Sequence, residues 1–501
     1  MNFSKSKYCM YWQCPKMCWL DKYRHDKFKT DQSAQARLSA GTEVGKLARK
    51  LFGEFKDVTV EKDGSLDLQA MVEKTEQLLK EDAENICEAS FSFGGLYCAV
   101  DILHRQDGGY AVYEVKSSTK LHEVYLADIA YQKYVLQKCG VNVTGVYLVN
   151  INNKYEKCGE VDIHKLFKIN DVSNLIAEEE KVVESNLTKA EKLLKETDEP
   201  EVGLNKSCKK PHECGFWNYC SDSLPKPSVF DLYKLPIEKK VDAYRKGIVT
   251  FEDLKNSGIN LNAMQKRQVD YSLNDKPPHI DKDKINKFLS KLWYPLYFLD
   301  FETLQYVIPE FDGTRPYTQI PFQYSLHYIE CEGGEIKHKE FLGVSGEDSR
   351  REIAERLCSD IPQNACVLAY NKKFECGRLK ELASLFPDLG EHLLKIRDNV
   401  FDLIVPFEGG AFYNRAMGGS FSIKSVLPAL FPDDPSLNYH NLEGVHNGSE
   451  AMSKFPEIRT LPPEQAEKAR RDLLKYCELD TFAMVKLWQK LVRCVTEDEV
   501  R

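Results

Sequence analysis

Hydrophobic and polar residues alternate over the first half of the chain in a pattern that predicts strands followed by helices. Residues 91–103 have alternating or apolar flanks on either side of a glycine pair, which is typical of a β-hairpin. A second glycine turn precedes a predicted strand over 110–116. A helix that begins at Glu123 and an apolar strand over 143–149 come next. This alternation predicts a first α/β core.

A second α/β pattern begins at Trp293. Residues 295–299 are mostly apolar and lead directly into acidic residues, which indicates a buried strand with carboxylates at its end. Further strands are expected over 322–329, 335–342 and 365–370, and helices over 350–361 and 464–493. The fold class predicted for the whole chain is therefore α/β, with two separate cores.

Helix-favouring segments flank and separate these two patterns. Helices are expected over 35–55 and 66–86, and charged, helix-favouring sequence fills 162–200. The proline-rich stretch 223–227 is the clearest boundary in the chain. Residues 230–290 then form a helical connector.

Two stretches of the connector, 246–254 and 263–268, resemble helix–turn–helix units that contact a DNA backbone. A plain helical spacer explains them equally well. The sequence thus predicts three parts, namely a first α/β domain over 1–225, a connector over 226–292 and a second α/β domain over 293–501.

Composition and charge narrow the class of protein. The chain has 501 residues, too many for one ordinary core, and a formal net charge of −8, which argues against a wholly basic nucleic-acid binder. The N-terminus lacks the apolar run of a signal peptide, and no apolar stretch is long enough to span a membrane. We therefore expect a cytoplasmic protein. Its 16 cysteines then indicate reduced thiols, some of them metal ligands, rather than disulfides.

Asp101, Glu114 and Lys116 make up the first candidate site. Because side chains alternate along a strand, Glu114 and Lys116 share one face while Val115 points into the core. A neighbouring strand that ends at Asp101 would place its carboxylate beside them. Two close carboxylates bind Mg²⁺ or Mn²⁺, and a lysine can orient a nucleophile. A surface Glu–Lys pair with an unrelated aspartate is the alternative interpretation.

Asp300 and Glu302 begin the second candidate site, on one face of a strand that follows an apolar run. Tyr476 and Asp480 are four residues apart and therefore share one helix face. Carboxylates from separate elements can bind two metal ions, and a tyrosine can position the attacking water. Exposed Asp-x-Glu pairs are common, but the preceding apolar run argues against exposure here.

Cys208, Cys214 and Cys220 are equally spaced in a short segment broken by proline and glycine. Three thiolates leave a tetrahedral site incomplete, so a fourth cysteine is needed. The N-terminal candidates are Cys14, Cys9 and Cys18. Four thiolates bind either zinc or an iron–sulfur cluster.

The first half resembles the RecB-like PD-(D/E)XK nucleases that carry an iron–sulfur cluster, a branch that includes the CRISPR-associated adaptation exonuclease. Asp101 and Glu114-Val115-Lys116 match its catalytic motif, and Gln132 matches the glutamine of its following helix. The resemblance covers about residues 1–225. It implies that Cys14, as part of a Cys-Pro motif, and Cys208, Cys214 and Cys220 hold a [4Fe-4S] cluster around the nuclease core.

Two positions depart from that branch. Leu136 stands where the glutamine helix usually has a tyrosine, and Gly45 stands where an early helix often has a metal-binding histidine. Glu88 is the acid that could supply the missing contact. The number of metals at this site is therefore open.

The second half resembles the DnaQ-like, RNase H-like 3′→5′ exonucleases of the DEDD group, in their tyrosine-bearing variety, over about residues 293–490. Asp300 and Glu302 match the first motif, and Tyr476 and Asp480 the third. The second motif usually has asparagine followed four residues later by aspartate. The resemblance implies a role for Glu375 there, with Asp402 as an alternative acid and the insert over 406–460 as the border of a substrate groove.

The fused order of the two domains also resembles a bacterial family of unknown function. Together these features predict a metal-dependent nuclease with two active sites that hydrolyses phosphodiester bonds, with DNA favoured over RNA and attack from an end. A nucleic-acid-binding scaffold, or an accessory protein of repair or defence, with one or both sites degenerate is the alternative. No membrane association is expected.

Overall fold

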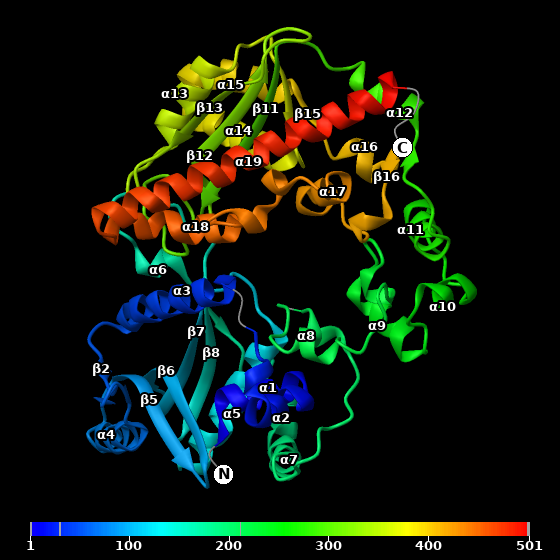
Figure 1. Cartoon of the computed structure of the whole chain (residues 1–501). Coiled ribbons are helices and arrows are strands. Elements are labelled where there is room, and N and C mark those ends of the chain that lie inside the picture. The colour runs from blue at the N-terminus through cyan, green and yellow to red at the C-terminus, as the bar shows by residue number, and fades with distance from the viewer. Residues whose placement is uncertain (1–2, 30–31, 211, 498–501) are drawn as a thin grey trace. The chain divides into compact units, whose positions relative to one another are not determined.

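The computed structural model describes residues 3–29, 32–210 and 212–497, and it divides into two compact units of mixed α/β structure (Figure 1). Unit 1 consists of the chain up to Ser223 together with Tyr306–Thr318, and unit 2 of Leu224–Gln305 with the chain from Gln319 onward. The α/β class agrees with the prediction from sequence. The first division lies close to the predicted boundary at 225, whereas the connector belongs to unit 2 and residues 306–318 belong to unit 1.

Unit 1 contains a seven-stranded mixed sheet in the order β2-β5-β6-β7-β8-β9, with β1 paired to β6. The hairpin predicted over 91–103 is present, and both glycines of its turn, Gly94 and Gly95, have positive φ angles of 57° and 82°. The strands are β1 (Phe3–Ser4), β2 (Lys56–Asp57), β5 (Asn85–Phe93), β6 (Leu96–Gln106), β7 (Gly109–Lys116), β8 (Val143–Ile151) and β9 (Phe167–Asp171).

Two details of unit 1 differ from the sequence expectations. Strand β6 does not end at Asp101 but continues to Gln106, because the apolar pattern resumes after the aspartate. The segment 162–200, expected to be helical throughout, contains strand β9 between α6 and α7. The helices are α1 (Lys5–Gln13), α2 (Pro15–Tyr23), α3 (Gln32–Ala48), α4 (Leu68–Lys80), α5 (Glu123–Lys138), α6 (Ile163–Leu166), α7 (Ala177–Leu193) and α8 (Trp217–Cys220).

Helices cover both faces of this sheet and create two cores. On one face, α1, α4, α5 and α7 pack around residues such as Tyr8 and Tyr131, whose rings stack at 5.0 Å. On the other face, Val44 and Ala48 of α3 pack with Tyr113. Val307 of the segment 306–318 is buried in the same core, which explains why that segment belongs to unit 1.

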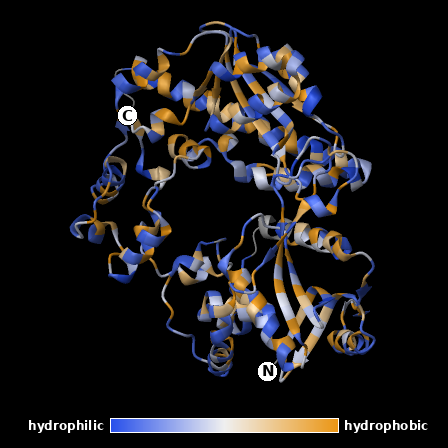
Figure 2. Cartoon of the chain, turned by 180° about the vertical axis from the view of Figure 1, so that it is seen from behind, coloured by the Kyte–Doolittle hydropathy of each residue, from blue (hydrophilic) through white to orange (hydrophobic). Residues whose placement is uncertain are grey.

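The main sheet of unit 2 has the order β13-β12-β11-β14-β15. Strands β11, β12 and β13 are antiparallel neighbours, whereas β14 and β15 run parallel to β11. Hydrophobic residues are frequent along the strands of both units, as the orange colour along the ribbons shows (Figure 2). The strands are β11 (Leu296–Leu304), β12 (Ile320–Ile329), β13 (Lys337–Leu342), β14 (Cys366–Ala369) and β15 (Val400–Asp402).

Successive side chains of β12 point to opposite faces of this sheet. Tyr324 and Leu326 point into the main core, which α13 (Arg350–Asp360), α14 (Lys373–Leu385) and α15 (Pro387–Asp398) complete. Gln323 and Ser325 point to the opposite face, where they hydrogen-bond with the 34-residue helix α19 (Pro463–Thr496). This helix crosses the strands in Figure 1. A polar strip is therefore buried between the sheet and α19.

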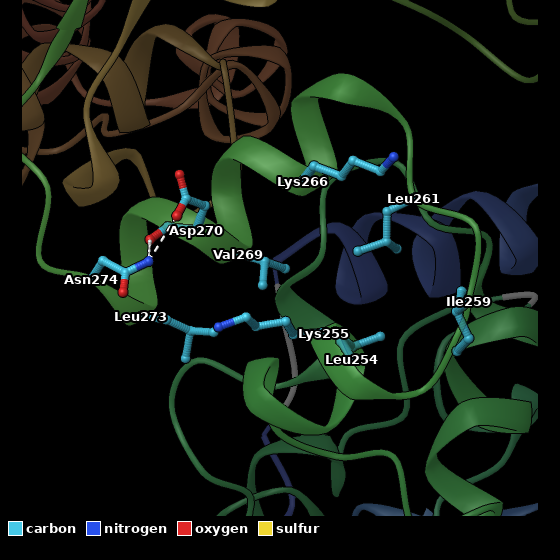
Figure 3. Close-up of a pocket in the computed structure, with 9 residues that line it drawn as sticks. All are labelled: Leu254, Lys255, Ile259, Leu261, Lys266, Val269, Asp270, Leu273 and Asn274. Atoms are coloured by element: carbon cyan, nitrogen blue, oxygen red, sulfur yellow. Dashed lines mark hydrogen bonds between the residues drawn. The ribbon is translucent and has the colours of Figure 1, made fainter.

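The connector is helical, as predicted, and has a small core of its own. It is tied to the rest of unit 2 by a two-stranded pairing of β10 (His279–Ile280) with β16 (Phe412–Tyr413). A cavity of about 230 Å³ lies between its helices and is lined by apolar side chains with Lys255 and Lys266 (Figure 3). The connector helices are α9 (Ile237–Arg245), α10 (Phe251–Asn256), α11 (Ala263–Leu273) and α12 (Lys282–Leu289).

Among the described residues, no helix is both long enough and apolar enough to cross a bilayer.

A close approach at Gly215 gives a test of the packing of unit 1. A Cβ atom there would lie 2.4 Å from the ring of Phe28, which itself packs on Phe216 at 5.1 Å. We expect Gly215→Ala to lower the free energy of unfolding by about 1–3 kcal/mol through overpacking. Gly41→Ala, inside α3 with nothing within 4 Å of the added carbon, should instead stabilise by about 0.5–1 kcal/mol. Denaturant melts that rank the two variants in the opposite order would contradict this packing.

Candidate functional sites

Three carboxylates meet in unit 2 between β11 and α19. Asp300 and Glu302 lie on the same face of β11, and Asp480 projects from α19, with one oxygen of each within 4.8 Å of the others. Glu302 and Asp480 are each only 8% exposed. The strand does not end at these acids, contrary to the prediction. It continues to Leu304 after an irregularity in pairing between Glu302 and Thr303.

The proximity of these acids opposes their ionisation. Burial, then the charges of Asp480 and Glu302, raises the pKa of Asp300 well above its usual value. Burial and Asp480 do the same to the pKa of Glu302. Burial raises the pKa of Asp480 to about 6, although hydrogen bonds and a nearby lysine limit the rise. Without a cation, the three groups cannot all be charged at neutral pH at low cost in free energy.

Two further residues complete this site, Lys424 from the stretch 418–424 that was expected to border a substrate groove and Tyr439, which sequence reasoning missed. Tyr439 donates a hydrogen bond of 2.6 Å to Oδ1 of Asp480. Lys424, at the start of α17 (Ile423–Leu430), donates to the hydroxyl of Tyr476 at 3.3 Å and to the carbonyl of His446 at 2.9 Å. Both come from the insert predicted to border a substrate groove. They lie in irregular or short elements, where no periodicity marks them.

A cavity of about 590 Å³ opens beside these two residues. Its lining combines basic groups such as Lys424 with apolar ones such as Phe431, and it also contains the acids Asp433 and Asp434. Lys424 and the aromatic rings of this lining can contact a ligand that has anionic and flat apolar parts, whereas the two aspartates oppose an anionic group next to them.

Glu375 is the acid for which the resemblance implied a role in the second motif. It lies on α14, is 2% exposed, and its Oε2 atom has no hydrogen-bond partner among the described residues. Burial raises its pKa to about 8, with a further contribution from Asp402. Its charge also acts on Asp300. Glu375 does not belong to the set of three oxygens within 4.8 Å.

Asp402, the alternative acid, has a different environment. Its carboxylate accepts hydrogen bonds from the backbone N–H groups of Asn371 and Lys372 at 2.8 and 3.1 Å. Asn371 has a left-handed φ of 69°, so these bonds stabilise an uncommon backbone conformation just before α14. Asp402 therefore positions the helix that carries Glu375.

The first candidate site forms in unit 1 between β6, β7 and α5. Lys116 donates to Oε1 of Glu114 at 2.5 Å, and the backbone N–H of Val115 donates to Oδ2 of Asp101 at 2.7 Å. Asp101 faces the point where pairing with β5 is interrupted at Glu88, whose φ is 56°. Glu88 itself pairs with Arg49 at 2.7 Å. The four predicted residues are thus neighbours, but Glu88 already has a cationic partner.

Three further side chains surround Glu114, which is 1% exposed. Gln132, as the resemblance implied, donates to Oε2 of Glu114 at 2.8 Å and to Asp128 at 2.9 Å. Asp128 also accepts from Lys116 at 2.8 Å. Lys5 of α1 donates to Glu114 at 3.0 Å. The spacing of Asp128 four residues before Gln132 could have revealed it, whereas nothing in the sequence around Lys5 could.

Carboxylates and lysines in this network act on Glu114 in opposite directions. Burial raises the pKa of Glu114 to about 7, with Asp101 and Asp128 adding to the rise and the two lysines opposing it. Although burial alone would lower them, the pKa values of Lys116 and Lys5 are raised by the surrounding carboxylates. Gly45, where a histidine was expected by resemblance, has open space around an added Cβ atom.

The four predicted cluster cysteines line one small cavity in unit 1. Cys14 lies between α1 and α2, and Cys208, Cys214 and Cys220 come from the segment that ends in α8. The backbone N–H of Asn205 donates to the sulfur of Cys208 at 3.4 Å, a contact that favours a thiolate. Apolar side chains such as Leu20, Phe216 and Trp217 also line the cavity.

The rival cysteines lie elsewhere. Cys9 is nearest the charges of Asp128, Lys116 and Lys5, so it borders the first candidate site. Cys18 is buried, and it is not among the residues that line the cysteine cavity. The geometry therefore brings Cys14, rather than either rival, to the other three thiols.

Comparisons with known proteins give a family without an assigned activity. Residues 297–422 match the family model described as "Domain of unknown function (DUF2779)". The chain is 28% identical over 231 residues to "Uncharacterized protein MG366" of Mycoplasma genitalium, covering 41% of this chain and 33% of that one. It is 26% identical over 224 residues to "Uncharacterized protein UU173" of Ureaplasma parvum, covering 41% and 32%. The matches thus span about a third of these relatives.

The raised pKa of Glu375 predicts how stability depends on pH. The carboxyl keeps its proton up to about pH 8 when folded but loses it near 4.5 in the unfolded chain, so unfolding releases a proton between these values. The stabilisation is complete below pH 4.5 and is lost as the pH rises towards 8. Each pKa difference of one corresponds to about 1.4 kcal/mol.

We therefore expect the free energy of unfolding of chelator-treated protein to fall between pH 5 and 8, and Glu375→Gln to flatten that fall. Denaturant titrations at several pH values measure it. Glu391→Gln, at an exposed position on α15, is the matched control and should leave the slope unchanged. Equal slopes for wild type and Glu375→Gln would show that Glu375 is not buried in its neutral form.

Proposed function

We propose that the protein is a metal-dependent nuclease that hydrolyses phosphodiester bonds, with DNA favoured over RNA and cleavage from an end. In this proposal unit 1 is a RecB-like PD-(D/E)XK nuclease and unit 2 an RNase H-like exonuclease of the DEDD group, both acting in the cytoplasm. One observation carries it, namely that Asp300, Glu302 and Asp480 are buried with their oxygens within 4.8 Å of one another.

Such a set is costly without a cation and well suited to one. Carboxylate oxygens are the ligands that Mg²⁺ and Mn²⁺ prefer, and a bound cation would restore the ionised form that mutual repulsion disfavours. Asp300, Glu302 and Asp480 would hold the metal, with Glu375 next to them. When bound, the metal would activate water and stabilise charge on the phosphate.

The surrounding residues have roles that follow from their contacts. Tyr439 fixes the carboxylate of Asp480 by donating to Oδ1. Lys424 holds the hydroxyl of Tyr476 at the edge of the carboxylate set, where that hydroxyl can orient a water molecule. The ammonium of Lys424 also offers positive charge to a phosphate that enters from the 590 Å³ cavity. These contacts support substrate binding on the side of the insert.

The first site has the residues of a nuclease but a different balance of charge. Asp101, Glu114 and Lys116 lie together, and Asp128 adds a third carboxylate. However, Lys5 and Lys116 both donate to Glu114, so two ammonium groups already offset two of the three carboxylate charges. A divalent metal would have to compete with Lys5 for the carboxylate of Glu114.

The competition between Lys5 and a metal ion for Glu114 favours the alternative function in which unit 1 is a nucleic-acid-binding scaffold. If Lys5 keeps its place, unit 1 binds nucleic acid without cutting it, and unit 2 alone cleaves. The chain would then be a nuclease with an attached nucleic-acid-binding scaffold. Because Lys5 contacts Glu114, measuring whether unit 1 cleaves nucleic acid decides between one active site and two.

Substitutions at the two sites test the proposal. With Mn²⁺ and end-labelled single- and double-stranded DNA and RNA, we expect Asp300→Asn to reduce cleavage from its site by at least about 100-fold, because a metal ligand is lost. Lys116→Ala should abolish a separate fraction of the activity. Asp283→Asn, on α12, and Lys120→Met, both at exposed positions, are the matched controls.

Three outcomes are informative. Absence of cleavage by the purified wild-type protein on all substrates would refute the nuclease proposal. Activity lost with Asp300→Asn but unaffected by Lys116→Ala, together with retained duplex binding, would establish the scaffold alternative for unit 1. If Asp300→Asn and Lys116→Ala both retain full activity, the assignment of the two catalytic sites is wrong.

We further propose that Cys14, Cys208, Cys214 and Cys220 hold a [4Fe-4S] cluster. A single zinc ion brings sulfur ligands to about 3.8 Å from one another, since each Zn–S bond is about 2.3 Å. The described cysteines form no group of three with sulfurs within 4.8 Å, although all four line one cavity. The wider spacing suits a cluster of several irons better than zinc. The cluster would join the start of unit 1 to its last segment.

Removal of one ligand should separate structure from catalysis. Cys214→Ser in anaerobically purified protein should lose most of its iron and lower the melting temperature of unit 1, because the closing segment loses its attachment. The activity that depends on Asp300 should remain. Cys139→Ser, at an exposed position, is the control. If the wild-type protein contains zinc instead of iron, the four cysteines bind zinc and the [4Fe-4S] proposal is wrong.

A further inference from the structure

A second group of potential metal ligands lies in unit 2, one strand away from the carboxylate set. His327 on β12 and His338 on β13 are directly paired across the two strands, and Glu478 projects from α19 above them. One ligand atom of each residue lies within 4.8 Å of the others. His327 is buried, His338 is half-buried and Glu478 is exposed. The group is therefore reachable from solvent.

Hydrogen bonds orient both imidazole rings. Nδ1 of His327 shares a hydrogen bond of 2.8 Å with the hydroxyl of Thr481, and Nε2 of His338 shares one of 2.9 Å with the hydroxyl of Ser325. Each ring thus uses one nitrogen in these contacts and keeps the other for a metal. Metal-binding histidines in proteins are commonly held in this way, with an outer partner that fixes the ring.

The ligand types indicate which metal would bind. Two imidazoles and one carboxylate are characteristic of Zn²⁺ and neighbouring transition metals, whereas Mg²⁺ and Mn²⁺ prefer the all-oxygen set of Asp300, Glu302 and Asp480. Ligands of a tetrahedral zinc ion lie about 3.3 Å apart, because the metal–ligand bonds are about 2.0–2.1 Å. The three ligand atoms already lie within 4.8 Å of one another, so small side-chain rotations would bring them to that separation. Glu340, on the same face of β13 as His338, or water would supply a fourth ligand.

We propose that His327, His338 and Glu478 form a Zn²⁺ site that fastens α19 to the β12–β13 hairpin. Its chemistry differs from that of the carboxylate site, so the two sites would select different ions. The three protein ligands form one cluster, and the outer partners of the two histidines are hydroxyl groups of the same polar strip.

The zinc site would act on the carboxylate site through that strip. Thr481 follows Asp480 in α19, and its hydroxyl shares a hydrogen bond of 2.7 Å with Ser325. Ser325 is in turn the registered partner of Asp300 across β11 and β12. Glu478 lies two residues before Asp480. A metal that binds Glu478 therefore restrains the part of α19 that carries Asp480, which makes the three ligands positioning residues with respect to Asp480.

Metal content is the direct test. The full chain is dialysed against Zn²⁺ at neutral pH, freed of excess ion, and its zinc is measured by plasma mass spectrometry. We expect His338→Gln and Glu478→Gln each to bind one equivalent less than wild type. Other zinc-binding groups, including the cysteines, are common to all variants and cancel in the difference. His164→Gln, an exposed histidine on α6, is the control and should bind as much zinc as wild type.

Thermal melting supplies an independent readout. Added Zn²⁺ should raise the melting temperature of wild type and of His164→Gln, and this increase should be lost in Glu478→Gln. Because Glu478 is exposed, its replacement keeps the test valid if His338→Gln fails to fold. Equal zinc content in wild type and Glu478→Gln, or an equal rise in melting temperature, would overturn the proposal whatever the nuclease activity of the chain.

Discussion

Packing helix α19 onto a sheet face that carries Asp300 and Glu302 places like charges together in a medium that screens them poorly. Three features of this region reduce that repulsion. Tyr439 donates to Asp480, Lys424 brings a positive charge nearby, and the acids hold protons at pH values where they are usually ionised. A globular core gains nothing from such an arrangement, because apolar residues of the same volume would pack there at lower cost. The persistence of three acids in a buried position is thus an argument for a bound cation.

The two carboxylate sites show how the same residue types produce different chemistry. In unit 1, lysine ammonium groups are part of the network, and Glu114 has partners on both of its oxygens. In unit 2, the one lysine beside the acids contacts Tyr476 and a carbonyl rather than a carboxylate. The first network has two lysines for its three carboxylates, whereas in the described part of unit 2 the three carboxylates are offset by Lys424 alone and keep their protons more readily. Affinity for a divalent ion follows that difference rather than the number of acids.

The sequence predicted the elements that are encoded by local hydrophobic periodicity and by turn residues. The β5–β6 hairpin, the central strands of both sheets and helix α19 follow from periodicity and glycine turns, whereas strands β1, β2 and β9 were not predicted. It placed Asp101 and Asp300 at strand ends, but both strands continue, because a single acidic residue does not stop a ladder whose neighbours are apolar. Lys5 and Tyr439 were missed because their partners lie far away in the chain. The pairing of His327 with His338 depends on strand register, which the sequence does not display.

The chain crosses between the two units more often than a simple tandem arrangement requires. Residues 306–318 leave β11, contribute Val307, Ile308 and Tyr317 to the core around α3, and return to begin β12. Tyr317 also donates its hydroxyl proton to the carbonyl of Ser117. A fragment cut at the proline-rich boundary would therefore lack part of its own hydrophobic interior. The N-terminal half therefore cannot be expressed alone with a complete core, because three of its core side chains come from a segment more than 80 residues beyond that boundary.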